Sequence, residues 1–91
     1  MLSLNEVNAK LEKLNNWSFN LDSIEKEFLF NSTILAKKFI DKVYELSEQK
    51  QHHALILWDR LIVKINLKTH KEKSVTEKDF ELAEEIDKVY K

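Results

Sequence analysis

The sequence contains no cysteine, no glycine and no proline. Without cysteine the chain has no disulfide framework, no thiolate nucleophile and no cysteine-ligated zinc finger. Without glycine it lacks the phosphate-binding loop and the dinucleotide-binding turn, because both need backbone conformations that glycine provides. Nucleotide-driven chemistry is therefore not expected. Glycine and proline also commonly occupy turns, so we expect asparagine and aspartate to take that role here.

The chain also lacks a long apolar run and an excess of either charge. No run approaches the roughly 20 apolar residues that a membrane-spanning helix needs. The 15 Lys and Arg and 16 Asp and Glu are interspersed, which gives no footprint for direct binding to nucleic acid or an anionic membrane. The first residues, MLSLNEVNAK, have no signal-peptide apolar core, so we expect a cytoplasmic protein.

The length of 91 residues predicts a single domain over residues 1–91. A chain of this size buries a modest core, which favours self-association as a further source of stability. The apolar residues of the chain recur at helical and strand spacings. This pattern defines the fold class better than the composition does.

Apolar periodicity predicts three helices and four strands. Ser3 with Glu6 three positions later forms a capping box, and Thr76 with Asp79 forms an aspartate variant of it. The predicted order is helix 4–15, strands 17–21 and 27–30, a helix from Asn31 or Ser32 to Lys50, strands 54–58 and 62–69, and a helix from Thr76 to the C-terminus. Short turns join antiparallel strands, and amphipathic helices bury their apolar stripes. The sequence thus predicts an α+β two-layer sandwich, a four-stranded antiparallel sheet with three helices on one face.

The predicted second hairpin brings the segments that carry the three histidines of the chain close together. Centring it on residue 61 pairs 55 with 67 and 57 with 65, and its buried face then carries Leu55, Leu57, Val63, Ile65 and Leu67. The opposite face carries Ile56, Trp58, Lys64, Asn66 and Lys68, and is available to another subunit. Continued outward, this register sets His52 opposite His70. Paired strands lie about 4.8 Å apart, so we expect His52 and His53 to meet His70, with Asp79 nearby.

Three interpretations of this cluster are open from spacing alone. In the first, one imidazole donates a proton and another accepts one, while Asp79 fixes a tautomer. In the second, the histidines and the acid bind zinc, although adjacent His52 and His53 seldom both reach one ion and no HExxH spacing exists. In the third, the histidines are solvated or are satisfied within the core.

The segment from Glu48 to Asp79 resembles the pterin-4a-carbinolamine dehydratase family. The motif of that family is an acidic residue, a double histidine, an apolar hairpin, a Thr-His or Ser-His pair and a downstream aspartate. Its counterparts here are Glu48, His52, His53, Thr69, His70 and Asp79. The similarity extends backward through Trp17, the EKEFLF segment, Phe39 and Val43, and so covers nearly the whole chain.

The resemblance implies dehydration of a 4a-hydroxytetrahydropterin to a quinonoid dihydropterin, which recycles the pterin cofactor of aromatic amino acid hydroxylases. It makes His52 and His70 the main acid/base candidates, and Asp79 a residue that orients or polarises a histidine. It implies no metal and no redox cofactor, because the reaction is an elimination. The substrate-binding residues that it implies are His53, which holds or deprotonates the pterin, Thr69 and Glu48.

The resemblance also implies a homodimer or homotetramer, formed by edge-to-edge sheet pairing and by packing of the second helix on its symmetry mate. Some family members are the dimerisation cofactor of a homeodomain transcription factor. This sequence departs from the family pattern at Ala54, where proline is expected, at Ile56, where tryptophan is expected, and at Arg60, where an aromatic is expected. These departures predict an altered pocket wall. The alternative function is therefore a pterin-binding or protein-interaction module with weak or absent catalysis.

Overall fold

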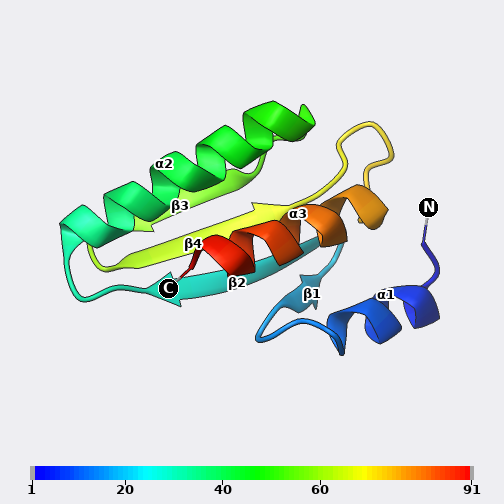
Figure 1. Cartoon of the computed structure of the whole chain (residues 1–91). Coiled ribbons are helices and arrows are strands. Elements are labelled where there is room, and N and C mark those ends of the chain that lie inside the picture. Colours follow the sequence, from blue (N-terminus) through cyan, green and yellow to red (C-terminus); the bar gives the residue numbers. More distant parts are fainter. Residues whose placement is uncertain (1, 91) are drawn as a thin grey trace.

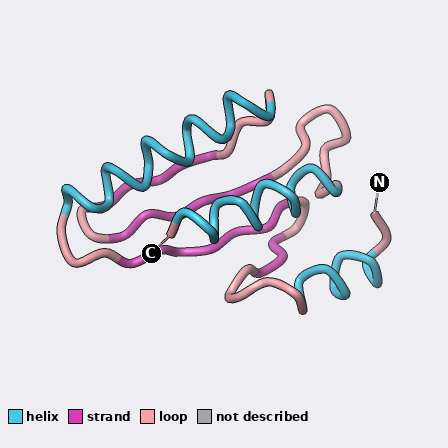
Figure 2. The backbone as a smooth tube through the Cα atoms, viewed as in Figure 1, coloured by secondary structure: helices cyan, strands magenta, loops and turns pink. Residues whose placement is uncertain are grey.

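A computed structural model describes residues 2–90, and within that range the chain forms three helices and four strands (Figure 1). The elements are α1 (Leu4–Leu11), β1 (Ser18–Asn20), β2 (Ser23–Leu29), α2 (Thr33–Lys50), β3 (Leu55–Asp59), β4 (Ile62–Leu67) and α3 (Glu77–Val89). The strands form one antiparallel sheet in the order β1-β2-β4-β3, and the helices lie over one of its faces (Figure 2). The predicted fold class and element order are confirmed.

The core lies between the helices and one face of the sheet. Alternate residues of β2 and β4 point into it, and Phe28 and Val63, which pair across these strands, are both completely buried. Burying an apolar side chain of this size contributes about 1.5–3 kcal/mol. The remaining core side chains of the sheet and helices include Val7, Ile24, Ala36, Phe39, Val43, Ile65, Leu67, Phe80, Leu82, Ala83 and Ile86. The other face of the sheet has no helix over it within residues 2–90.

The predicted register of the second hairpin is wrong by one residue. Leu55 pairs with Asn66 and Leu57 with Lys64, so the hairpin is centred between residues 60 and 61. Because strand side chains alternate between faces, this shift turns Leu55 and Leu57 to the open face, where they are 55% and 52% exposed. Ile56 lies on the helix side instead.

The turn between β3 and β4 explains the shift. Asp59 pairs with Ile62, which leaves a two-residue loop of Arg60 and Leu61, and Arg60 has a left-handed φ of 54°. A two-residue loop with positive φ matches the twist of paired strands, whereas a centre on residue 61 needs three loop residues. The Trp58 indole N–H donates to the Arg60 carbonyl oxygen at 2.7 Å and holds the turn.

The prediction that asparagine and aspartate occupy the turns is confirmed at Asp22 in the β1–β2 turn, but asparagine occupies only one of the five left-handed positions within residues 2–90. These positions are Asn16, Leu21, Gln51, Arg60 and Lys73. A left-handed conformation costs a residue with a Cβ atom about 1–2 kcal/mol, so neighbouring contacts must offset that cost at the other four positions.

The helix boundaries refine the predictions. Helix α1 begins with the predicted Ser3 and Glu6 capping box but ends at Leu11, because the Leu14 N–H bonds three residues back to the Leu11 carbonyl. Helix α2 begins after Ser32, as predicted, and ends at Lys50. Strand β2 begins at Ser23, which the sequence placed in a turn. The left-handed Gln51 then reverses the chain toward the double histidine.

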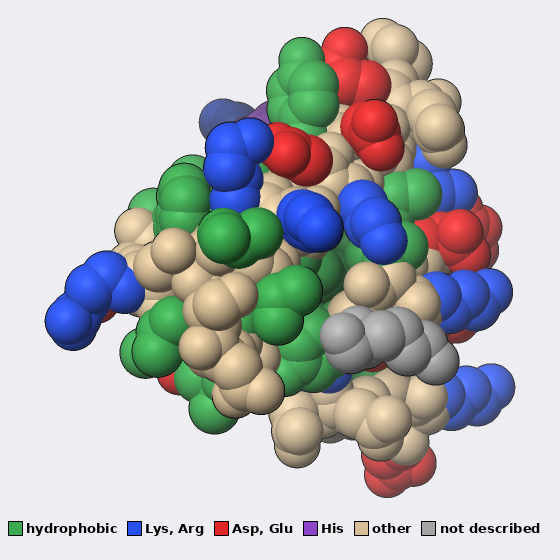
Figure 3. Space-filling view, turned by 60° about the vertical axis from the view of Figure 1, so that its left-hand side comes forward, with side chains coloured by type: hydrophobic (Ala, Val, Ile, Leu, Met, Phe, Trp, Pro, Cys, Tyr) green, Lys and Arg blue, Asp and Glu red, His purple; other side chains and the backbone are tan. Residues whose placement is uncertain are grey.

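Apolar side chains reach the surface on one side of the molecule, among lysines (Figure 3). The exposed set in the described structure includes Leu29, Ile34, Leu35, Tyr44, Leu55, Leu57, Trp58, Leu61 and Ile62. Most belong to α2, to the edge strand β3, or to the β3–β4 turn. An edge strand that carries exposed apolar residues is a surface on which another chain can pair.

Candidate active site

Four element ends meet at one end of the sheet: the C-terminus of α2, the start of β3, the end of β4 and the N-terminus of α3 (Figure 1). His52 and His53 lie between α2 and β3, and His70 lies in the loop that follows β4. The antiparallel pairing of β3 with β4 brings the first two histidines back toward the third. The candidate site is built from these connections.

His52 is bound to a buried carboxylate. Its Nε2 lies 2.5 Å from Asp79 Oδ1, with the His52 side chain 11% exposed and the Asp79 side chain completely buried. The Asp79 Oδ2 atom accepts the Thr69 hydroxyl at 2.8 Å and the Thr76 backbone N–H at 2.8 Å. An ionised carboxylate accepts only, so this network assigns the proton to His52 Nε2 and leaves Nδ1 as the acceptor.

Thr69 and Thr76 complete the network around the carboxylate. Their hydroxyl oxygens are 2.6 Å apart, and since Thr69 gives its proton to Asp79, Thr76 donates to Thr69. Thr76 also begins α3, whose first turn carries Asp79. Helix capping and orientation of His52 therefore depend on the same carboxylate.

His53 has an exposed acidic partner. Its Nε2 contacts Glu48 Oε2, and the two side chains are 60% and 47% exposed. An ion pair in such contact with water is screened and contributes about 0–1 kcal/mol. Glu48 therefore guides the His53 imidazole without fixing it as Asp79 fixes His52.

A cavity of about 280 Å³ lies on the open face of the sheet beside His53 and His70. It is lined by His53, Ala54, Leu55, Asn66, Lys68 and His70. His53, which precedes β3, and His70, which follows β4, thus share one cavity. A flat heterocycle fits a pocket near this size. The pair can exchange protons with a bound ligand.

A family model described as pterin 4 alpha carbinolamine dehydratase matches residues 1–89. The chain belongs to the pterin-4a-carbinolamine dehydratase family. A relative from Prochlorococcus marinus is 38% identical over 91 residues, covering 98% of this chain and 94% of the relative. One from Sulfolobus acidocaldarius is 32% identical over 90 residues, covering 97% of each. Both carry names that assign them, provisionally, to this dehydratase.

Two solved structures share the fold of this chain. A Brucella melitensis protein described as a transcriptional coactivator/pterin dehydratase superimposes with a TM-score of 0.95 at 26% identity, covering 99% of this chain and 98% of its own. A pterin dehydratase-like protein described as a RuBisCO assembly factor of the alpha-carboxysome has a TM-score of 0.66 at 23% identity, covering 79% and 83%. The second likeness is one of fold alone.

The structure does not bring all three predicted histidines into one cavity. The expected pairing of His52 with His70 is wrong, because the observed register, continued outward, sets His52 opposite Thr69. Asp79 bridges these two residues. His53 and His70 share the cavity on the open face, and His52 does not line it.

The residues predicted to bind substrate differ in their surroundings. The Thr69 hydroxyl is engaged by Asp79 and Thr76, and Thr69 does not line the cavity with the histidines. Glu48 reaches that region through its contact with His53. Within residues 2–90, no three His, Asp or Glu side chains form a group that could hold a metal ion.

The departures from the family pattern affect the cavity unequally. Ala54 lines it. Ile56 packs against the core on the helix side and does not line this cavity. That these departures alter a pterin-binding wall stays a prediction. Arg60 lies in the turn at the other end of the hairpin. The one-residue register shift explains these placements.

Sequence reasoning missed Leu55, Asn66 and Lys68 as cavity residues. The Asn66 side-chain amide donates to Ser23 Oγ at 2.9 Å and to Glu25 Oε1 at 3.1 Å, and Lys68 Nζ lies 3.2 Å from Asp22 Oδ2. Asn66 and Lys68 alternate with the core residues Ile65 and Leu67, and this alternation is the sequence signal that the two polar residues share one face. Only the correct register places that face beside His53.

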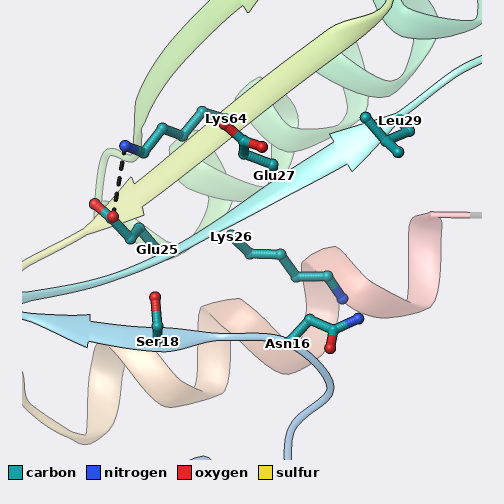
Figure 4. A pocket seen from close by; sticks show the side chains of 7 residues that line it. All are labelled: Asn16, Ser18, Glu25, Lys26, Glu27, Leu29 and Lys64. Atoms are coloured by element: carbon teal, nitrogen blue, oxygen red, sulfur yellow. Dashed lines mark ion pairs between the residues drawn. The ribbon is translucent and has the colours of Figure 1, made fainter.

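Glu25, on β2, contacts both Asn66 and Lys64 of β4. Burial raises the pKa of the Glu25 carboxyl, but hydrogen bonds from Asn20 and Asn66 and the charge of Lys64 together hold its pKa below the usual value. Lys64 Nζ lies 3.5 Å from Glu25 Oε2 (Figure 4). These residues line a second pocket, of about 440 Å³, which also includes Ser18 and which none of the histidines lines. Figure 4 shows its lining side chains.

No helix in the described part of the chain combines the length and apolar character needed to cross a membrane.

Proposed function

We propose that the chain dehydrates a 4a-hydroxytetrahydropterin to a quinonoid dihydropterin and water. The observation that supports this most is the cavity shared by His53 and His70, next to the His52 and Asp79 pair. A proton goes to the departing 4a-hydroxyl as the C4a–O bond breaks. A second proton leaves N5, whose electron pair forms the new C–N double bond.

Histidine acid/base catalysis supplies both proton transfers in this proposal. His53, at the start of β3, and His70, after the end of β4, both contact the bound pterin. His52, the third acid/base candidate, is held by Asp79 with Nδ1 free to accept a proton. Imidazole suits both steps because it exchanges protons near neutral pH. The product must then be reduced by two electrons, in a separate reaction, before it can serve a pterin-dependent aromatic amino acid hydroxylase again.

The direct test is the rate of carbinolamine dehydration above its spontaneous rate. General acid/base catalysis contributes about 10²–10⁴-fold, so His52→Ala, His53→Ala and His70→Ala should each lower kcat by about 10²-fold or more. Glu81→Ala, on the exposed side of α3, is the surface control. A wild-type protein that does not accelerate the reaction would contradict the proposal.

We also propose that the chain forms a homodimer or homotetramer. Strand β3 is an edge of the sheet and exposes Leu55 and Leu57, and α2 exposes Ile34, Leu35 and Tyr44. These surfaces suit strand pairing and helix packing between copies.

The second candidate function is a protein-interaction module with little catalysis. The exposed apolar surface favours it, and the description of the Brucella melitensis neighbour as a transcriptional coactivator agrees with it. Full wild-type turnover would contradict the non-catalytic form of this candidate. Partner binding without acceleration of dehydration would favour it over the enzyme.

A further inference from the structure

Ser47 lies in the last turn of α2 and is 2% exposed. Its carbonyl oxygen accepts the His52 N–H at 3.0 Å, and its hydroxyl oxygen accepts the Ala54 N–H at 3.3 Å. These two donors flank His53 in the chain. One buried residue therefore holds the backbone on both sides of a cavity histidine.

The segment that Ser47 holds has no regular structure of its own. Residues 52–54 lie between the left-handed Gln51 and the first residue of β3, so no strand ladder pairs their N–H groups, and Ser47 supplies the partners of both the His52 and the Ala54 N–H. An N–H that loses its partner when it is shielded from water is destabilising, and the chain rearranges to recover a partner. Such a rearrangement would move Ala54, and with it the cavity wall beside His53.

We infer that Ser47 is a positioning residue for the double histidine, acting through its hydroxyl on the Ala54 N–H. Ser47 does not line the cavity and does not act on the substrate directly. It fixes the path of residues 52–54, and so keeps His52 in reach of Asp79 while His53 faces the cavity. The effect on rate rests on the proposed dehydratase function, but the effect on geometry does not.

The test compares Ser47→Ala in the wild-type and A54P backgrounds. Proline has no N–H, so in the A54P background residue 54 has no hydrogen bond to donate to the Ser47 hydroxyl. We expect S47A to lower kcat about tenfold in the wild-type background, with KM changed less than about threefold, because misplaced catalytic groups cost rate more than binding. In the A54P background the same substitution should change kcat less than about threefold. Equal losses in both backgrounds would overturn the inference.

A second measurement does not need activity. Amide hydrogen exchange at Ala54 and the imidazole NMR shifts of His52 and His53 report the backbone position directly. We expect S47A to speed exchange at Ala54 and to shift both imidazole signals. If exchange and shifts stay at wild-type values, the inference is overturned even when dehydration is measurable. If they change while wild-type protein shows no dehydration, the positioning inference stands and the proposed function fails.

Val43→Ala is the control for general destabilisation. Val43 lies one turn earlier on the same buried side of α2 and contacts neither histidine through a hydrogen bond in the described structure. It should lower the unfolding temperature without faster exchange at Ala54, and the A54P background should not reduce its effect. If S47A alone fails to fold, the S47A/A54P double variant should still fold, and its failure would overturn the inference.

Discussion

Asp79 accepts a hydrogen bond from His52 across 27 positions of sequence, at 2.5 Å. The carboxylate is completely buried, and its second oxygen is held by Thr69 and by the Thr76 N–H. The His52 imidazole is thus oriented by a rigid acceptor that also caps α3. His53 has the opposite surroundings, since its acidic partner, Glu48, is half-exposed.

Asp79→Asn should lower kcat/KM by about 100-fold. An amide cannot accept from His52, Thr69 and Thr76 together, so either the His52 tautomer changes or the helix cap is lost. The measurement is the dehydration rate, together with the ¹⁵N shifts of the His52 imidazole. Glu77→Gln is the matched control, because Glu77 lies in the same turn but makes only an exposed ion pair with Lys10 at 3.4 Å. A wild-type rate in the D79N variant would refute the role of Asp79.

Glu48→Gln should have a much smaller effect, a loss of at most about fivefold in kcat/KM. The Glu48 and His53 side chains are 47% and 60% exposed, and an exposed pair contributes about 0–1 kcal/mol. Salt screens such pairs, so wild-type activity in high salt should approach that of the variant. The measurement is kcat/KM across ionic strength. A loss as large as that of D79N would mean that Glu48 does more than guide the imidazole.

The sequence predicts the element order and the Asp79 neighbourhood, because capping and periodicity are local signals. Ser3, Ser32 and Thr76 each begin a helix where expected, within one residue. The histidine partners depend instead on register. A loop of two rather than three residues at Arg60 decides whether Leu55 faces the core or the cavity, and without glycine in the turn no residue type marks which loop forms.

Glu25→Gln should reduce stability near neutral pH, and the loss should become smaller as the pH falls. The pKa of Glu25 is lowered in the folded protein, so its stabilising contribution is present above the unfolded pKa and is lost as pH falls through the folded value. The measurement is urea unfolding of both proteins from pH 7 to pH 3, where the difference in unfolding free energy should shrink. Glu81→Gln, on the exposed side of α3, is the control. A gap that stays constant across this range would contradict the assignment.

Leu21→Gly should stabilise the protein. Leu21 has a left-handed φ of 61° in the β1–β2 turn and is 88% exposed, so its side chain gains little from burial while its backbone conformation is costly. Glycine removes a cost of about 1–2 kcal/mol and loses about 0.5–1 kcal/mol in chain entropy, for a net gain of up to about 1.5 kcal/mol. The measurement is chemical unfolding. Leu29→Gly, at the exposed last residue of β2, should be destabilising because Leu29 has a strand conformation, and equal effects of the two substitutions would contradict this expectation.

Leu57→Lys should dissociate the proposed oligomer. Leu57 is 52% exposed on the open face of β3, the edge strand, and a lysine there places a charge where a second copy would pair. Sedimentation at one protein concentration should show a smaller species for the variant than for the wild type. Glu81→Lys places a lysine on α3, away from the edge, with twice the change in net charge, and should leave the mass unchanged. If L57K sediments as the wild type does, copies do not meet at β3, and the exposed surface of α2 becomes the remaining candidate interface.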